Sequence, residues 1–278
     1  MIISVASGKG GTGKTTIATN LALSIGNVQF LDCDVEEPNA NIFLKIAIKE
    51  HENVSVHIPL IDKEKCDYCG KCAGFCAYHA LAVVRSQVLV FPELCHSCGG
   101  CELVCPRHAV QWKERILGRI EHGEISGIDL YQGILNVGES QAIPVIKALK
   151  RKLQKNKTVI IDAPPGTSSP VIESINGSNY CLLVTEPTPF GLHDLKLAVE
   201  VVRHLRIPFG VIINRDGIGD MSVEQYCQAE HIPIVLKIPE QHNIALLYSK
   251  GIALVNETQE WKEMFHQMFT RLQETVKK

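Results

Sequence analysis

The sequence predicts an α/β protein with a doubly wound, mostly parallel sheet. Several short apolar stretches have the length and composition of buried strands, at residues 2–6, 27–34, 158–162, 180–184, 209–214 and 234–238. Helix-like segments separate most of them, and strands that alternate with helices favour a parallel sheet covered on both faces. An abrupt change in composition at about residue 60 interrupts this pattern, which predicts a small inserted α+β domain.

This change in composition divides the chain into three segments. Residues 1–59 and 116–278 form the two parts of the main domain, and residues 60–115 form the insert. The net charge of -2 and the apolar content of 45% predict a soluble globular protein and argue against a general nucleic-acid-binding role. No apolar run is long enough to span a bilayer, and the N-terminus forms the first strand rather than a signal peptide, so we expect a cytoplasmic protein.

A glycine-rich loop, residues 7–16, lies between the first strand and a predicted helix. Four of its residues fit the pattern G-x-x-x-x-G-K-[ST]: Gly8, Gly13, Lys14 and Thr15. Backbone N–H groups and the helix N-terminus would surround a phosphate, Lys14 would reach the β- and γ-phosphates, and Thr15 would hold Mg²⁺. The alternative is a glycine-rich turn without a ligand. The expected nucleotide contacts of this loop are Gly8, Gly10, Gly11, Thr12, Gly13, Lys14, Thr15 and Thr16.

Lys9 adds a feature that the general pattern lacks. With it, residues 9–16 read K-G-G-T-G-K-T-T, which resembles the deviant P-loop of the MinD, ParA, Mrp and nitrogenase-iron-protein group of ATPases. The resemblance implies that the protein uses ATP and Mg²⁺ and closes on ATP as a dimer, either with an identical subunit or with a paralogue. It also implies that Lys9 crosses the interface to the partner's nucleotide and serves catalysis together with Lys14. The alternative for Lys9 is a solvated lysine.

Acidic residues end two of the predicted strands, at the edge of the sheet where α/β proteins bind ligands. By the same resemblance, Asp34 would orient or deprotonate the attacking water, and Asp32 would support the Mg²⁺ shell. The alternative for Asp32 is a helix or loop cap. Asp162 occupies the Walker-B position and would hold Mg²⁺ directly or through water.

Two later segments also resemble parts of these ATPases. The segment after Asp162 resembles their second switch, in which a glycine could turn its N–H toward the γ-phosphate and release the loop on hydrolysis. The residues of this switch are Pro164, Pro165 and Gly166. Two strand ends near the C-terminal half match positions that contact the adenine base, at Asn214, Arg215, Pro239 and Glu240.

Eight of the eleven cysteines lie between residues 66 and 105. They form the pattern C-x₂-C-x₂-C-x₃-C twice, and each cysteine of the second run lies 29 residues after its counterpart in the first. In a reducing compartment this arrangement favours metal ligation over disulfides. Zinc is the alternative metal, but zinc sites prefer two separated C-x₂-C pairs.

The duplicated run resembles a bacterial two-cluster ferredoxin, inserted whole into the ATPase. In such domains, three cysteines of one run and the fourth of the other hold each 4Fe–4S cluster. The resemblance therefore assigns one cluster to Cys66, Cys69, Cys72 and Cys105, and the other to Cys76, Cys95, Cys98 and Cys101. Pro106 follows Cys105 as the ferredoxin pattern expects, whereas Ala77 follows Cys76, a departure that removes no ligand.

The C-terminal segment, residues 257–276, has apolar residues at helical spacing, and MinD-type proteins carry a membrane-binding helix at this end. Here the polar face is mixed rather than rich in Lys and Arg, which favours a helix packed on the sheet. The apolar residues concerned are Trp261, Met264, Phe265, Met268, Phe269 and Leu272. We therefore do not expect membrane binding.

Three functions are compatible with these resemblances. The first is ATP-gated electron transfer through two 4Fe–4S clusters to an unidentified redox partner. The second is iron–sulfur or metallocofactor assembly, as in the Mrp-type carriers, although no C-x-x-C pair follows Cys105 in this chain. The third is a positioning ATPase of the MinD kind, which would leave the eight clustered cysteines without a role.

Overall fold

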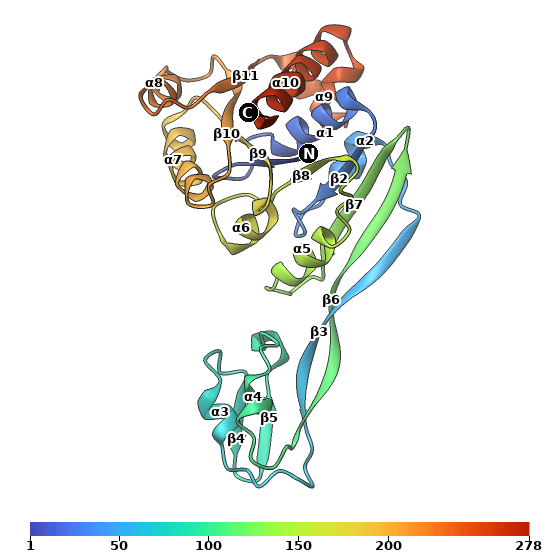
Figure 1. The fold of residues 1–278 in the computed structure, drawn as a ribbon, viewed down its shortest axis with the longest axis vertical. Helices are drawn as coiled ribbons and strands as arrows, with labels where there is room; N and C mark the ends of the chain where they lie inside the picture. Colours follow the sequence, from blue (N-terminus) through green and yellow to red (C-terminus); the bar gives the residue numbers. More distant parts are fainter. Residues whose placement is uncertain (278) are drawn as a thin grey trace.

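A nine-stranded sheet organises the main body of the protein in the computed structural model, which describes residues 1–277 (Figure 1). The strands are β1 (Ile2–Ala6), β2 (Val28–Asp32), β3 (Glu50–Ile61), β6 (Val110–Ile125), β7 (Ile128–Leu135), β8 (Thr158–Asp162), β9 (Tyr180–Thr185), β10 (Phe209–Asp216) and β11 (Ile234–Pro239). Their order is β11-β10-β9-β1-β8-β2-β7-β6-β3. Neighbours from β11 to β7 are parallel, and β7/β6 and β6/β3 are antiparallel. The predicted mostly parallel sheet is confirmed.

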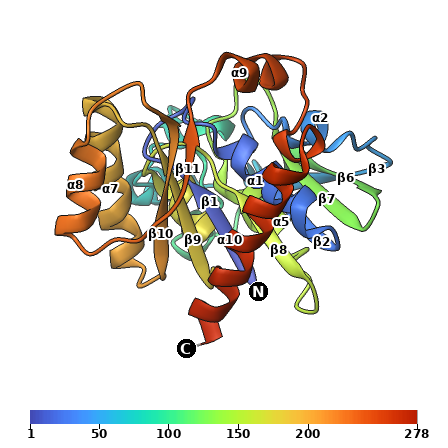
Figure 2. The same ribbon diagram turned by 90° about the horizontal axis from the view of Figure 1, so that it is seen from above.

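Helices cover both faces of this sheet (Figure 2). One face carries α1 (Lys14–Ile25), α2 (Ala40–Leu44), α9 (His242–Ser249), the short η2 turn (Leu254–Asn256) and α10 (Gln259–Lys277). The other carries α5 (Ile143–Lys150), α6 (Ser169–Ile175), α7 (Pro189–His204) and α8 (Ser222–Ala229). Successive strand residues face opposite sides: Ile3 and Val5 pack with α1 and α10, whereas Ala6 packs with α6 and α7. The result is a three-layer body with both faces of the sheet buried.

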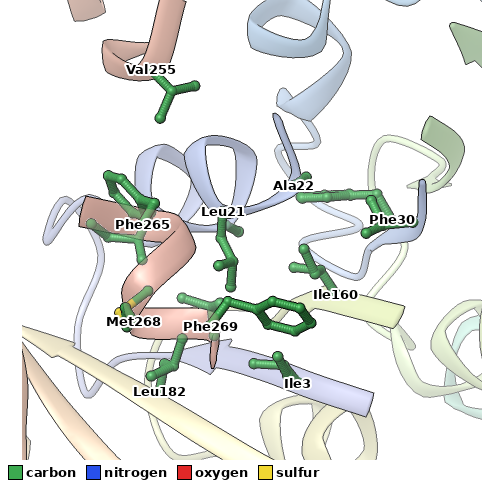
Figure 3. Packing of buried hydrophobic residues seen from close by; sticks show 14 of the residues in the cluster. Ile3, Leu21, Ala22, Phe30, Ile160, Leu182, Val255, Phe265, Met268 and Phe269 are labelled. Atoms are coloured by element: carbon green, nitrogen blue, oxygen red, sulfur yellow. The ribbon is translucent and has the colours of Figure 1, made fainter. Parts of the chain in front are cut away.

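Helix α10 packs on the sheet and on α1. Phe265, Met268 and Phe269 are buried among side chains of α1, β1 and β9, as Figure 3 shows. The predicted packing role of this helix is therefore confirmed. Among residues 1–277, no helix is both long enough and apolar enough to cross a membrane.

Residues 62–109 form a cysteine-rich module at the far end of a two-stranded ribbon made by β3 and β6 (Figure 1). The module contains α3 (Lys71–Phe75), β4 (Leu81–Val84), β5 (Gln87–Val90), the η1 turn (Pro92–Leu94) and α4 (Gly100–Leu103). Strands β4 and β5 form an antiparallel hairpin. The domain boundaries predicted from composition, 59/60 and 115/116, fall within the ribbon strands, because composition does not mark where paired strands leave a sheet.

The ribbon has a bulge at the point where it leaves the body. Val54 pairs with Gly118 and Ser55 pairs with Ile116, so Leu117 of β6 is an extra residue. From Val110 to Ile116, β6 pairs only with β3, whereas from Gly118 to Ile125 it also pairs with β7. A bulge bends a strand and increases its local twist, so this residue marks the base of the ribbon.

Candidate functional site

A cavity of about 460 Å³ lies at the carboxyl edge of the parallel strands, beside the glycine-rich loop. A volume of this size is ordinary for a small-molecule or cofactor site. Ten of the predicted nucleotide contacts line it, namely Gly10, Gly11, Gly13, Lys14, Thr15, Thr16, Asn214, Arg215, Pro239 and Glu240. The predicted contacts Gly8 and Thr12 do not line it; Thr12 is buried, and a side chain at Gly8 would collide with the backbone of Asp194.

The glycine-rich loop needs glycine at its end. Gly13 has a φ of 92°, which L side chains rarely adopt, and a Cβ atom there would come within 2.4 Å of the Asn214 amide nitrogen. Helix α1 starts directly afterwards at Lys14, so its free N–H groups and positive end border the cavity. This arrangement is an anion site of the kind that binds phosphate.

Thr15 and Asp162, both predicted to hold Mg²⁺, are in contact. The Thr15 hydroxyl donates to Oδ2 of Asp162 at 2.5 Å, and Oδ1 of Asp162 has no hydrogen-bond partner although the residue is only 1% exposed. Burial raises the pKa of Asp162 to about 7, with Lys14 and Thr15 acting in the opposite direction. A buried carboxylate oxygen without a partner is well suited to a hard cation such as Mg²⁺.

Asp34 and Asp32 lie at the end of β2 in different surroundings. Asp34 borders the cavity, and burial raises its pKa to about 6, with Lys14 lowering it. Asp32 is fully buried and accepts the backbone N–H groups of Asp34, Asn39 and Ala40 at 3.1–3.2 Å. These are the contacts of a loop cap, the alternative considered above, so the role of Asp32 near Mg²⁺ stays a prediction.

Two predicted contacts are occupied by the protein itself. The Asn214 amide donates to the Thr12 carbonyl oxygen at 2.8 Å and so ties β10 to the glycine-rich loop. The N–H of Gly166 donates to the Ser7 carbonyl oxygen at 3.0 Å rather than toward the cavity, which Pro165 lines instead. Gly166 would have to exchange its bond before its N–H could contact a nucleotide, whereas the Asn214 amide still has a second N–H and its oxygen for such a contact.

Glu186 is a residue that the sequence analysis missed. Its side chain is 7% exposed and bridges two cations: Lys9 Nζ lies 3.2 Å from Oε2, and an Arg215 guanidinium nitrogen lies 2.8 Å from Oε1. Lys9 is thus neither in the cavity nor freely solvated in this structure. The available signal was an acidic residue directly after a buried strand, the same signal that identified Asp34 and Asp162.

Helix α9 and the residue before it form one wall of the cavity and were also missed, although the preceding Pro239 and Glu240 were predicted. Gln241, Ile244, Ala245 and Tyr248 line the cavity there, together with Glu37 and Asn39 on the β2 side. Tyr248 stacks on Phe43 of α2, with ring centroids 5.3 Å apart, so the wall is supported from behind. A helix of ordinary composition carries no sequence motif that would have revealed this contact.

The cysteine-rich module contains two further cavities, each lined by four cysteines. Cys76, Cys95, Cys98 and Cys101 line a cavity of about 150 Å³, here called the Cys95 cavity. Cys66, Cys69, Cys72 and Cys105 line a smaller one of about 20 Å³, here called the Cys66 cavity. Each set combines three cysteines of one run with the fourth of the other, which is the grouping that the predicted ligand sets require. Within residues 1–277, no three His, Cys, Asp or Glu side chains are grouped as they would be around a single metal ion.

The two cysteine runs have the same local geometry, 29 residues apart. The Ala80 N–H donates to Cys76 Sγ and the Ala109 N–H donates to Cys105 Sγ, both at 3.3 Å. Positive φ values also recur in pairs along the two runs, at Tyr68 and Ser97, Gly70 and Gly99, and His79 and His108. The sequence repeat is therefore a structural repeat, in which both runs wrap a cavity in the same way.

The fold and the glycine-rich loop agree with comparisons to known proteins. An uncharacterised protein of Methanocaldococcus jannaschii is 30% identical, over 99% of this chain and 98% of its own length. An iron-sulfur cluster carrier protein of Pyrococcus horikoshii is 22% identical, over 85% of this chain and 73% of its own length. The structure of the septum site-determining protein MinD complexed with Mg-ADP, also from P. horikoshii, has a TM-score of 0.60 at 20% identity and covers 100% of this chain and 96% of its own.

Residues 3–255 match the sequence family described as the CobQ/CobB/MinD/ParA nucleotide binding domain. This match covers the glycine-rich loop, Asp34, Asp162 and the whole parallel part of the sheet. The chain belongs to the CobQ/CobB/MinD/ParA family and contains its P-loop nucleotide-binding domain.

Proposed function

We propose that this ATPase holds two 4Fe–4S clusters in a ferredoxin-like insert and uses ATP binding and hydrolysis to gate electron transfer through them. The observation that carries the proposal is the pair of cysteine cavities, because the fold divides eight cysteines into two sets of four, each drawn from both runs. A MinD/ParA-type ATPase does not need these cysteines for nucleotide chemistry. They lie at the end of the ribbon, away from the nucleotide cavity (Figure 1).

The cavities fit this kind of cluster. Each thiolate of a cubane binds a different iron, so the sulfur atoms must surround a shared space rather than meet at one point. The Cys95 cavity already provides about 150 Å³, whereas the Cys66 cavity, at about 20 Å³, would open as its cysteines move apart around a cluster. The N–H groups of Ala80 and Ala109 donate to cysteine sulfur, a contact that tunes cluster reduction potentials. When bound, each cluster would accept and return one electron.

On the nucleotide side, each proposed role follows from a position in the cavity. Lys14, at the start of α1, would neutralise the β- and γ-phosphates, and Thr15 and Asp162 would hold Mg²⁺. Asp34 borders the cavity and would accept a proton from the attacking water or orient it. Gly166 would exchange its bond to Ser7 for one to the γ-phosphate, so the switch would respond to hydrolysis.

A dimer completes this proposal. Lys9 is held by Glu186 in the single chain, and its side chain is 32% exposed, so it can leave this partner when a second subunit and its nucleotide approach. We expect ATP to convert the protein from monomer to dimer and Lys9→Ala to stay monomeric with ATP bound. Light scattering with ADP and with a non-hydrolysable ATP analogue measures this; dimerisation of Lys9→Ala as in the wild type would contradict it.

The test of the main proposal is an anaerobic iron determination and EPR redox titration of the full chain, with and without Mg-ATP. We expect two low-potential cubane signals, at least one of which changes with ATP. Lys14→Ala should lose about 100-fold in ATP affinity, since a charge-assisted contact contributes about 3 kcal/mol, and should keep its iron. Cys69→Ser should damage one cluster and keep ATP binding. A protein that contains zinc without iron, or clusters indifferent to nucleotide, would contradict the proposal.

Cluster assembly is the second candidate, because three iron-sulfur cluster carrier proteins are related to this chain at 21–23% identity. A carrier releases its cluster to an acceptor, whereas an electron carrier keeps it. Incubation of the iron-loaded protein with an apo-ferredoxin separates the two: retained iron with fast electron exchange supports gating, and ATP-stimulated iron transfer supports assembly.

A further inference from the structure

One loop, residues 135–141, joins the nucleotide site to the Cys95 cavity; we call it the bridging loop. It starts at the last residue of β7, where the Leu135 N–H donates to the Val35 carbonyl oxygen at 2.8 Å. Val35 is buried and directly follows Asp34, which borders the nucleotide cavity. The loop therefore begins at a residue that is hydrogen-bonded to Val35, the neighbour of Asp34, and Asp34 would face the ATP.

The middle of the bridging loop is fixed to the base of the ribbon. The Asn136 N–H donates to the carbonyl oxygen of Leu117, the extra residue of the bulge, at 2.8 Å. Glu139 accepts the Arg115 guanidinium through both carboxylate oxygens at 2.5 and 2.6 Å, and both side chains are at most 14% exposed. A mostly buried ion pair is costly to break once formed, so the loop and the bulge move together.

The end of the bridging loop holds the protein segment that carries Cys95. The Gln141 amide donates to the Cys95 carbonyl oxygen at 3.0 Å and to the Glu93 carbonyl oxygen at 3.3 Å. On the other side of this segment, the Ser97 hydroxyl donates to the His57 carbonyl oxygen of β3. Gln141 is the side chain of the bridging loop that contacts the peptide of a cavity-lining cysteine.

We propose that the bridging loop transmits the nucleotide state of the segment after Asp34 to the Cys95 cavity, with Gln141 as the positioning residue. The inference rests on the proposed function, since it assigns a route to the gating. A shift of Val35 would move Leu135, and through Glu139 and Gln141 it would reorient the Cys95 peptide beside the cavity. Polar groups and solvent access around a cluster set its reduction potential, so a small movement there is sufficient.

The experiment is an EPR redox titration of the iron-loaded full chain with ADP and with a non-hydrolysable ATP analogue. In the wild type, the midpoint potential of one cluster should differ between the two nucleotides. Gln141→Ala should lose this difference while its affinity for either nucleotide stays within twofold. Gln141→Glu, which keeps the shape but has no donor, should lose it too. The matched control is Gln87→Ala, an exposed glutamine of the same module, which should behave as the wild type.

Hydrogen exchange of residues 93–98 provides a second readout in the same samples. Exchange there should depend on the nucleotide in the wild type and in Gln87→Ala, but not in Gln141→Ala. A wild-type response in Gln141→Ala, in both potential and exchange, would overturn the inference and leave the proposed function standing. An iron-loaded wild type whose potentials ignore the nucleotide, or a protein without cubane clusters, would instead contradict the proposed function itself.

Discussion

The main body and the cysteine-rich module are held together by different means. In the body, the sheet is buried on both faces, and large side chains such as Phe30, Ile160 and Phe265 have no exposed surface. Where the module meets the ribbon, each hydrophobic cluster has only three buried residues, and one of the three is a cysteine: Ile58, Ala80 and Cys95 in the first, and Leu81, Cys101 and Val110 in the second. Apolar burial therefore stabilises the body far more than it stabilises the module.

This difference has a general cause. A segment as short as the module buries too little apolar surface to offset its conformational entropy, so small units of this kind usually need disulfides or metals. All eleven cysteines are free thiols in this structure. The comparison therefore predicts that the two regions respond in opposite ways to metal removal and to core mutations.

The largest expected effect is the response to removal of iron. Chelation under reducing conditions should unfold the module while the body keeps its thermal transition, because the body's core contains no cluster cysteine. Hydrogen exchange should show loss of protection across residues 62–109 by at least about 100-fold, which corresponds to about 3 kcal/mol of local stability. Equal protection in the iron-loaded and chelated proteins would contradict the dependence of the module on metal.

The next effect is the reverse case, a core mutation in the body. Phe265 of α10 is fully buried, so Phe265→Ala should lower the free energy of unfolding of the body by about 3–5 kcal/mol, through lost burial and the cavity left behind. The iron content of the module should not change. Leu103→Ala is the control, because Leu103 is 86% exposed in the module and its loss should cost less than about 0.5 kcal/mol. Denaturant unfolding measures both.

A third effect concerns pH and the nucleotide site without ligands. The pKa of Asp162 is about 7 in the folded protein, above its ordinary value of 3.8. The folded state therefore binds this proton more tightly than the unfolded state does, and the resulting stabilisation is complete below pH 4 and is lost as the pH rises through 7. Asp162→Asn removes this loss and should be more stable than the wild type at pH 8 by on the order of 2–4 kcal/mol. Thermal melts from pH 4 to 8 without Mg²⁺ and nucleotide test this. A parallel pH dependence in both proteins would refute it, and exposed Asp220→Asn should follow the wild type.

The smallest expected effect is at Glu186. Glu186→Gln weakens the pairing with Lys9 and Arg215, whose side chains are 32% and 49% exposed, so solvent limits the cost to about 1 kcal/mol. The body should be destabilised by this amount, and the ATP-dependent dimer should form at a lower protein concentration because Lys9 is no longer held. Exposed Glu200→Gln on α7 is the control. Unchanged stability and unchanged dimerisation together would show that Glu186 does not restrain Lys9.

The comparison of the two regions also explains what the sequence could predict. The glycine-rich loop and the cysteine runs could be predicted because their residues are close together in the chain. The structure places Lys14 and Thr15 at the nucleotide cavity and groups the cysteines in two sets of four. The parallel strands were found because burial on both faces leaves a continuous apolar run. Both signals are local.

The missed features are contacts between distant segments. Glu186 is informative only when Lys9 and Arg215 are known to lie on either side of it, and Gln141 only when Cys95 is known to lie opposite. Asp32 has the residue type of a metal ligand, but its hydrogen bonds to the loop after β2 decide its role in this structure. Tertiary partners determine these roles, and a single sequence does not reveal them.

The ribbon is a lever arm between the main body and the cysteine-rich module. From the bulge outward, Ser55–Ile61 of β3 is paired with β6 alone, a rod of about 23 Å at the usual rise of a strand. A tilt of about 10° at its base would displace the far end by about 4 Å, simply from the length of the rod at the standard strand rise. Under the proposed function, a tilt of this size would change the separation between a cluster and a docked electron carrier by several ångströms, a distance to which electron tunnelling is steeply sensitive.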